Sequence, residues 1–187
     1  MLPEAQPPAI RTARIILRGW RDADLAPFAR LTADPVVMEH FPATLDRQQS
    51  DALVERLADH IARHGFGFWA LEIPGVASCA GFVGLVHVPF SAAFTPAVEL
   101  GWRLDRACWG RGYATEAARA AARYAFTELK LTEIVAVAVP ANIRSLAVME
   151  RIGMRRDPDG DFDHPRFPAG HRLQRHVLYR LTADELQ

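Results

Sequence analysis

The apolar residues of this chain follow two spacings, and each spacing predicts one kind of secondary structure. We assign seven short segments to β-strands, and all but residues 154–156 have the apolar runs and flanking turn residues that are typical of strands. These segments are residues 14–18, 68–73, 82–88, 98–104, 134–139, 154–156 and 176–181. Residues 134–139 are apolar without alternation, so we expect that strand to be buried on both faces of a sheet.

Four further segments place apolar residues three or four positions apart, as one face of an α-helix does. Asp22, Asp46 and Asn142 are suited to cap three of these helices, and Gly153 would end the last one. The remaining helix begins at Tyr113 and is nearly all alanine on one face, which lets it lie close to the strands. Its polar residues form one stripe predicted to face solvent: Glu116, Arg119, Arg123, Thr127 and Lys130.

The order of these segments predicts the fold class. Strands that neighbour one another in sequence, followed by alternating strands and helices, indicate one mixed α/β sheet with helices on both faces. Residues 98–104 and 134–139 would form a parallel pair joined by the alanine-rich helix in a right-handed crossover. We expect residues 1–10, which contain three prolines, to be a flexible arm, and residues 11–187 to form a single domain.

Composition narrows the class of protein without identifying it. The chain has 22 basic and 22 acidic side chains, so we expect no nucleic-acid partner. No apolar run approaches the roughly 18 residues that a membrane span needs, and the N-terminus lacks a signal-peptide pattern, so we expect no membrane association. Two separated cysteines, Cys79 and Cys108, favour a reduced compartment, which makes the cytoplasm the expected location.

Four histidines raise the question of a metal centre: His64, His164, His171 and His176. The last three have no adjacent cysteine and no H-E-x-x-H spacing, and the segment around them is too irregular for a ligand helix. We therefore predict that the protein binds no metal.

The most specific local pattern follows the strand at 98–104. Trp109 precedes Gly110-Arg111-Gly112, and the alanine-rich helix starts directly afterwards. Glycines allow positive φ, and a helix N-terminus leaves successive N–H groups unpaired, so this turn is suited to bind phosphate. The spacing matches neither the dinucleotide fingerprint nor the P-loop. A tight strand-to-helix turn without a ligand is the alternative.

The neighbours of the glycines make the pattern more specific. Residues 109–117, Trp-Gly-Arg-Gly-Tyr-Ala-Thr-Glu-Ala, resemble the acetyl-CoA pyrophosphate loop of the GNAT superfamily of N-acetyltransferases, in the form found in its RimJ/RimL-type branch. Residues 12–18, 142–145 and 149–154 extend the resemblance over most of the chain. One departure is Ala107, where the superfamily usually has Gln or Arg. Phosphate binding would then depend on backbone amides, helped by Arg106 or Arg111.

The resemblance implies the GNAT acyl-CoA N-acyltransferase fold, with about seven strands, four helices and a V-shaped split between the central strands. It implies an acetyl-CoA-dependent enzyme that moves an acetyl group to a primary amine by direct attack in a ternary complex. The amine would belong to a protein N-terminus or to a small molecule. The alternative is a non-catalytic acyl-CoA-binding or regulatory module, favoured by Ala107 and by Met149, where many relatives have a tyrosine acid. The acceptor, and the choice between monomer and homodimer, stay open.

The resemblance also assigns residues to the cofactor. The expected acetyl-CoA-binding residues are Trp102, Arg103, Leu104, Trp109, Gly110, Arg111, Gly112, Tyr113, Ala114, Thr115, Asn142, Ser145 and Arg151. Ser145 is expected to act in catalysis by hydrogen-bonding the CoA sulfur, and the alternative is a serine that bonds its own helix backbone. Arg151 would approach the 3′-phosphate, unless it is a solvated surface arginine.

Glu99 is the predicted general base, acting directly or through water. In simple alternation it shares a sheet face with Gly101 and Arg103, and the alternative role is an ion-pair partner of Arg103. Three further residues are candidates for acceptor binding: Trp69, Asp163 and His164. Asp163 or His164 would orient or deprotonate the amine from a loop over the acceptor site. A plain surface loop, and a core position for Trp69, are the alternatives.

Overall fold

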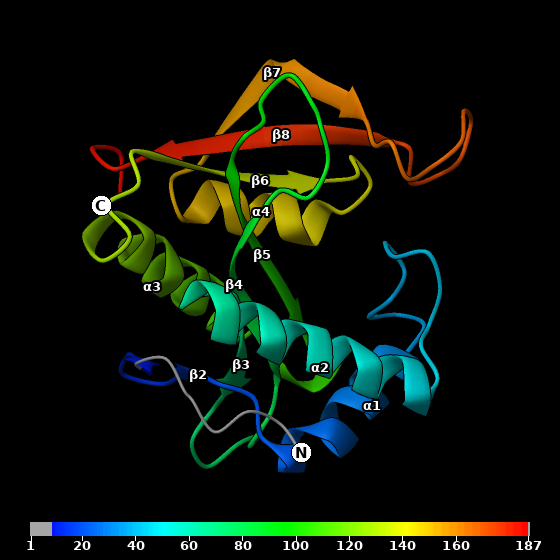
Figure 1. The fold of residues 1–187 in the computed structure, drawn as a ribbon, viewed down its shortest axis with the longest axis vertical. Helices are drawn as coiled ribbons and strands as arrows, with labels where there is room; N and C mark the ends of the chain where they lie inside the picture. Colours follow the sequence, from blue (N-terminus) through cyan, green and yellow to red (C-terminus); the bar gives the residue numbers. More distant parts are fainter. Residues whose placement is uncertain (1–8, 187) are drawn as a thin grey trace.

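The computed structural model describes residues 9–186, which form one mixed eight-stranded sheet with four helices (Figure 1). The strands are β1 Ile10–Arg11, β2 Ile16–Arg18, β3 Phe68–Glu72, β4 Gly81–His87, β5 Val98–Leu104, β6 Glu133–Ala138, β7 Arg155–Asp163 and β8 Arg175–Thr182. The helices are α1 Leu25–Ala33, α2 Arg47–His64, α3 Tyr113–Thr127 and α4 Ile143–Arg151. Two short 3-10 turns are η1 Asp22–Asp24 and η2 Arg106–Cys108.

The sheet has the strand order β1-β2-β3-β4-β5-β6-β8-β7, and β5 and β6 form its parallel pair. All seven predicted strands and all four predicted helices are found, and β1 is added at the edge. Residues 1–8 of the predicted arm lie outside the described residues. Ile10 was assigned to that arm, but it lies in β1, pairs with Leu17 of β2 and therefore belongs to the sheet. Within residues 9–186, no helix is both long and apolar enough to span a bilayer.

The predicted strand at 154–156 is too short. β7 continues to Asp163, and its pairing with β8 shifts register between Asp157 and Phe162. Pro158 has no N–H for the ladder and lies within this irregularity, so the sequence pattern suggests a loop where a bulged edge strand is present. Phe162 and Asp163, predicted in an irregular segment, are therefore strand residues.

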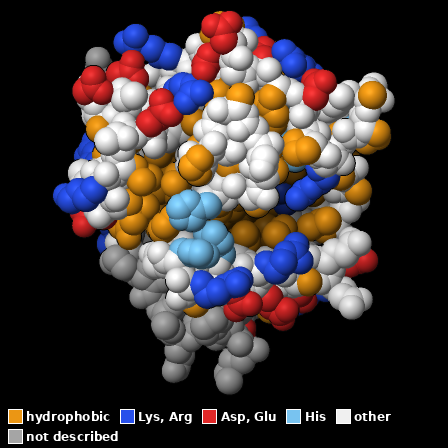
Figure 2. Space-filling view, turned by 45° about the horizontal axis from the view of Figure 1, so that its top comes forward, with side chains coloured by type: hydrophobic (Ala, Val, Ile, Leu, Met, Phe, Trp, Pro, Cys, Tyr) orange, Lys and Arg blue, Asp and Glu red, His pale blue; other side chains and the backbone are white. Residues whose placement is uncertain are grey.

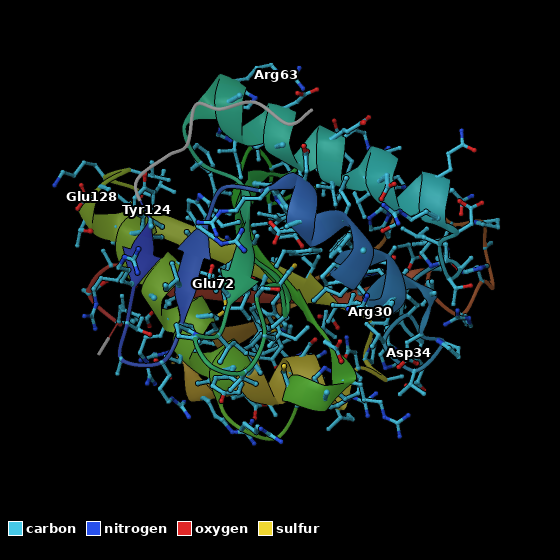
Figure 3. The ribbon with its side chains drawn as sticks, turned by 90° about the horizontal axis from the view of Figure 1, so that it is seen from below. Arg30, Asp34, Arg63, Glu72, Tyr124 and Glu128 are labelled. Carbon is cyan, nitrogen blue, oxygen red and sulfur yellow. The ribbon has the colours of Figure 1, made fainter. Side chains whose placement is uncertain are left out.

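Helices cover both faces of the sheet (Figure 3). The ring of Phe28 in α1 lies 6.1 Å from that of Phe82 in β4, and the ring of Trp69 in β3 lies 5.3 Å from that of Tyr124 in α3. Ala70 is the β3 partner of Phe82 and follows Trp69, so the two ring contacts lie on opposite faces. The sheet-facing alanines of α3 are completely buried: Ala117, Ala118, Ala121, Ala122 and Ala125.

β5 and β6 separate soon after they meet. Glu99 pairs with Val135, and among the described residues no later position of β5 pairs with β6, although β5 stays paired with β4 as far as Leu104 (Figure 1). The two parallel strands therefore diverge toward their carboxyl ends. This divergence is the V-shaped split that the resemblance implies.

A buried ion pair fixes the first strands to the turn before α1. Arg18, only 3% exposed, donates to both carboxylate oxygens of Asp24 at 2.7 and 2.9 Å and to Glu72 at 2.6 Å. Glu72 stands at the end of β3 (Figure 3). The contacts satisfy a guanidinium that would otherwise be buried without a counter-charge.

We expect Asp24→Ala to lower the free energy of unfolding by about 3 kcal/mol, because it leaves Arg18 buried with one anion instead of two. Asp51→Ala is the matched control: it breaks the exposed Arg47–Asp51 pair of α2, where a change below about 0.5 kcal/mol is expected. Urea unfolding at pH 7 measures both variants, and equal effects would contradict the assignment.

Candidate active site

A cleft of about 900 Å³ opens where β5 and β6 separate. Its walls come from β5, the loop before α3, β6, α4, the loop between α1 and α2, and the segment between β7 and β8. Figure 2 shows apolar surface inside a hollow, with histidine and basic side chains along its edge. The cleft is large enough for an extended small molecule and is lined mainly by apolar groups.

The glycine loop forms one end of the cleft. Gly110 and Gly112 have φ values of 72° and 80°, and a Cβ on Gly110 would meet no atom within 4 Å. The amides of residues 110–115 donate to no acceptor within the described chain, and no side chain caps α3. Free N–H groups, the positive end of a 15-residue helix and open space above the turn together fit a diphosphate.

Arg14 fastens this loop to the first strands. Its Nη1 donates to the carbonyl of Arg111 at 3.0 Å, and its Nε and Nη2 each lie 2.6 Å from Oε2 of Glu116. Thr12 also bonds Glu116, at 2.5 Å. Glu116 is therefore not simply part of a solvated stripe, as its helical position had suggested. Residues 12–18 matched a family pattern in the sequence, but the spacing gave no indication that they hold the loop.

Glu99 lies on the face of β5 that is covered by α1. The register between β4 and β5 is continuous, so Glu99, Gly101 and Arg103 share that face as predicted. Burial raises the pKa of Glu99 to about 7, into the range of an effective general base at neutral pH. No ion pair joins Glu99 to Arg103, so the alternative of a structural pair is not observed.

The start of α4 forms the opposite wall. Asn142 caps the helix by accepting from the amide of Ser145 at 3.2 Å, and both residues line the cleft. Val148 and Met149 are buried on the same inward stripe. The Ser145 hydroxyl has no hydrogen-bond partner within residues 9–186, so it is available to a ligand.

The structure brings most predicted cofactor residues into one cleft. Those that line it are Trp102, Arg103, Leu104, Trp109, Gly110, Gly112, Tyr113, Ala114, Thr115, Asn142, Ser145 and Arg151. Arg111 belongs to the loop but does not line the cleft. Its carbonyl is held by Arg14.

Two of the three predicted acceptor residues are misplaced. Trp69 is completely buried in the core on the α3 face, so it has no access to an acceptor. Asp163 points to solvent, where it bonds Gln174 and Arg175. Only His164 lines the cleft, with its ring 4.6 Å from that of Phe90 and 5.1 Å from that of His176. Burial lowers the pKa of both histidines.

Two arginines that the sequence analysis did not single out connect one wall of the cleft to another. Arg172, between β7 and β8, donates to the carbonyls of Glu39 and Phe41 at 2.6 and 3.0 Å. Arg144 of α4 pairs with the Glu39 carboxylate at 3.0 Å. The loop between α1 and α2 is thereby tied to both elements on the far side of the cleft. These contacts join distant segments, so no sequence spacing could reveal them.

Metal ligation is predicted to be absent. Across the part of the chain that the structure describes, no three His, Cys, Asp or Glu side chains come together as a metal site. The absence of a metal stays a prediction.

The comparisons with known proteins identify the class. The family described as Acetyltransferase (GNAT) domain matches residues 14–155, so the chain belongs to the GNAT acetyltransferase family. The uncharacterized protein YkkB of Bacillus subtilis is 34% identical over 144 residues, which are 76% of this chain and 83% of that protein. The uncharacterized N-acetyltransferase YnaD of Bacillus subtilis is 28% identical over 177 residues, 94% of this chain and 98% of that protein.

Solved structures agree with that identification. The crystal structure of a GNAT-family acetyltransferase from Bacillus anthracis has a TM-score of 0.79 and 27% sequence identity, covering 95% of this chain and 100% of that chain. By class, the protein is an N-acetyltransferase, an enzyme that transfers an acetyl group to an amine.

We expect Gly112→Val to abolish CoA binding. The new Cβ would lie 3.3 Å from Nη2 of Arg14, which holds the loop, at a φ of 80° that a β-branched residue rarely adopts. Gly75→Val is the control: Gly75 has a φ of 74° with no atom near its Cβ position, and it does not line the cleft. Isothermal titration with CoA measures both variants. If Gly75→Val lost as much affinity for CoA as Gly112→Val, general backbone strain, and not a change in the glycine loop, would explain the loss of binding.

Proposed function

We propose that the protein uses acetyl-CoA to acetylate a primary amine by direct attack in a ternary complex. The observation that carries the proposal is the row of unbonded amides at residues 110–115, which lies at one end of the split between β5 and β6. Residues 109–115 would hold the diphosphate, Asn142 and the exposed edge of β5 the pantetheine arm, and Arg151 the 3′-phosphate. Acetyl-CoA supplies the acetyl thioester.

The residues of the cleft suggest how the reaction proceeds. Glu99 takes a proton from the incoming ammonium, directly or through water, so that the neutral amine can attack the carbonyl carbon. The new C–N bond forms and the C–S bond breaks, and the extra proton that the attacking nitrogen still carries passes to the CoA thiolate, which leaves as the thiol. Backbone N–H groups along the separated edge of β5 stabilise the carbonyl oxygen. Ser145 donates its hydroxyl proton in a hydrogen bond to the departing thiolate sulfur.

Cys108 lines the cleft but is unsuited to carry the acetyl group. Burial raises the pKa of its thiol, and the nearby Asp105 carboxylate adds to that effect. A thiol that is protonated at neutral pH is a poor nucleophile. Direct transfer to the amine therefore fits the site better than an acetyl-cysteine route.

The finer assignments are also proposals. We place the chain in the RimJ/RimL-type branch because of the sequence at 109–117. We also propose a cytoplasmic location and one domain that takes in Ile10 together with residues 11–187. Two rival acceptor classes follow from the resemblance, protein N-termini and small-molecule amines. The assignments of branch, domain, location and acceptor are the same whether the protein is a monomer or a homodimer.

Two measurements test the function. Purified protein should show a thermal shift with acetyl-CoA, because a ligand of the folded state raises the unfolding temperature. Release of CoA should then be followed with a panel of amines. Tight CoA binding with no release from any amine would favour the non-catalytic module instead. No thermal shift would remove acetyl-CoA from the proposal.

Glu99→Gln should remove the acidic limb of the pH profile of kcat/KM. Because the pKa of Glu99 is about 7, the base is active when deprotonated, and wild-type activity should fall as pH decreases through 7. The variant should lose roughly 10²–10⁴-fold in kcat/KM above pH 8. Glu55→Gln, on the exposed face of α2, should keep the wild-type profile. An unchanged profile for Glu99→Gln would show that another group is the base.

Ser145→Ala should lower kcat by roughly 10–10³-fold, which is the range expected for loss of a group that assists the leaving thiolate as a general acid does. The affinity for CoA should change by less than about threefold, because the loop amides are untouched. Steady-state kinetics and titration with CoA measure the two effects separately. Full kcat in the variant would exclude Ser145 from the reaction.

A further inference from the structure

Arg103 is a half-buried cation that opens on the cleft and has no anion beside it within the described residues. Its Nε and Nη1 are buried and have no hydrogen-bond partner within the described chain. The guanidinium carbon lies 3.8 Å from the ring centroid of Phe41 and 5.3 Å from that of Phe82. The two rings provide cation–π contact but accept no strong hydrogen bond. Burial lowers the pKa of Arg103 to about 10, and the side chain lines the cleft.

The contrast with Arg18 shows what is missing. Arg18 is more deeply buried than Arg103, and the protein gives it two carboxylates, from Asp24 and Glu72. No ion pair to Arg103 is found within residues 9–186, and Glu99 on the same strand makes none. An unpaired buried charge destabilises a fold, so a position of this kind indicates a partner from outside the chain.

The charge of the cleft points to an anionic partner. Glu99 is the one carboxylate among the cleft-lining residues of the described chain. Four arginines line the same cleft: Arg103, Arg144, Arg151 and Arg166. Arg144 pairs with the Glu39 carboxylate and Arg151 is assigned to the cofactor, which leaves Arg103 and Arg166 as the cations without an assigned partner. A polycationic acceptor would meet this excess of positive charge, whereas an acceptor with a negative group would be attracted by it.

The position of Arg103 limits what the partner can be. Glu99 and Arg103 share one face of β5 and are four residues apart, so their Cα atoms are separated by about 13 Å. Between them, ring atoms of Phe68 lie 3.0 Å from the Cβ position of Gly101. An amine next to Glu99 and an anion next to Arg103 would thus be joined by an apolar spacer that lies against Phe68.

The chemistry around Arg103 favours a carboxylate over a phosphate. Its ring neighbours Phe41 and Phe82 offer no donors, so the N–H groups of Arg103 itself would have to bind the anion. A guanidinium can bind both oxygens of a carboxylate, but it would leave oxygens of a phosphate without partners.

We propose that the acceptor is a small primary amine that carries a carboxylate at the far end of an apolar spacer, and that Arg103 binds this carboxylate. The inference rests on the proposed function, because it assumes that acetyl transfer occurs beside Glu99. It makes Arg103 a specificity-determining residue through its side chain, while its backbone still borders the pantetheine arm.

Three amines with one spacer and different ends test the proposal: 6-aminohexanoate, hexylamine and 1,6-diaminohexane. Wild-type kcat/KM should be highest for 6-aminohexanoate, lower for hexylamine and lowest for the diamine. Glycine, whose amine and carboxylate are too close to reach both residues, should be a poorer acceptor than 6-aminohexanoate. Equal or better use of the diamine would overturn the inference, and so would a lack of acetylation of all three amines by protein that releases CoA with another primary amine.

Arg103 variants show whether the preference arises at this side chain. Arg103→Met should reduce kcat/KM for 6-aminohexanoate by roughly 10–100-fold more than that for hexylamine, as expected for loss of a charge-assisted contact that only the carboxylate makes. Arg103→Lys keeps the charge without the planar fork and should give an intermediate value. Arg56→Met, on the exposed face of α2, should match the wild type with all three amines.

Folding and cofactor binding are checked on the same variants. Arg103→Met removes an unpaired buried charge, so its unfolding temperature should equal or exceed that of the wild type. Its affinity for CoA should stay within about threefold. A tenfold weaker affinity for CoA with an unchanged preference among the amines would assign Arg103 to the cofactor and overturn the proposal. Failure to bind CoA by the wild type would instead refute the proposed function.

Discussion

The active site depends on the loss of pairing between two parallel strands. β5 stays paired with β4 along its whole length, whereas its contact with β6 ends at Glu99 and Val135. Main-chain groups on the free edge of β5 therefore have no partner in the sheet, although buried backbone groups normally require one. An extended ligand with amide groups can replace the missing strand. The divergence thus creates both the cavity and the hydrogen-bonding edge that lines it.

The phosphate loop needs a fixed position relative to that edge. Alanine side chains allow α3 to lie directly on the sheet, and Arg14, near the N-terminus, holds Arg111 and Glu116. Two glycines with positive φ turn the chain between β5 and α3 so that consecutive amides face the cleft. The loop is therefore positioned by packing and by one arginine before any ligand binds. Such preorganisation reduces the free energy spent on ordering the site.

The sequence predicted the parts of this protein that are determined by local pattern. Hydrophobic spacing located the four helices and seven of the strands, and the loop motif located most residues of the cofactor end of the cleft. It failed where a long-range contact or a register shift decides the outcome. Trp69 lies in a strand that is buried on both faces, so its large ring is used for the core. Asp163 is carried to solvent by a bulged strand whose proline suggested a loop. The sequence does not show that Arg103 lacks an ion-pair partner, because that depends on which residues of other segments lie around its side chain.

The two halves of the cleft differ in how they are built. Regular elements with buried contacts form the cofactor half, but the acceptor half is closed by loops that Arg144 and Arg172 connect through exposed contacts. Exposed contacts of this kind contribute little to stability, so substitutions in these loops are tolerated. Evolution can therefore exchange the acceptor loops while the strand edge and the glycine turn stay constant. This modular division gives a physical reason for one scaffold to acquire many acceptors.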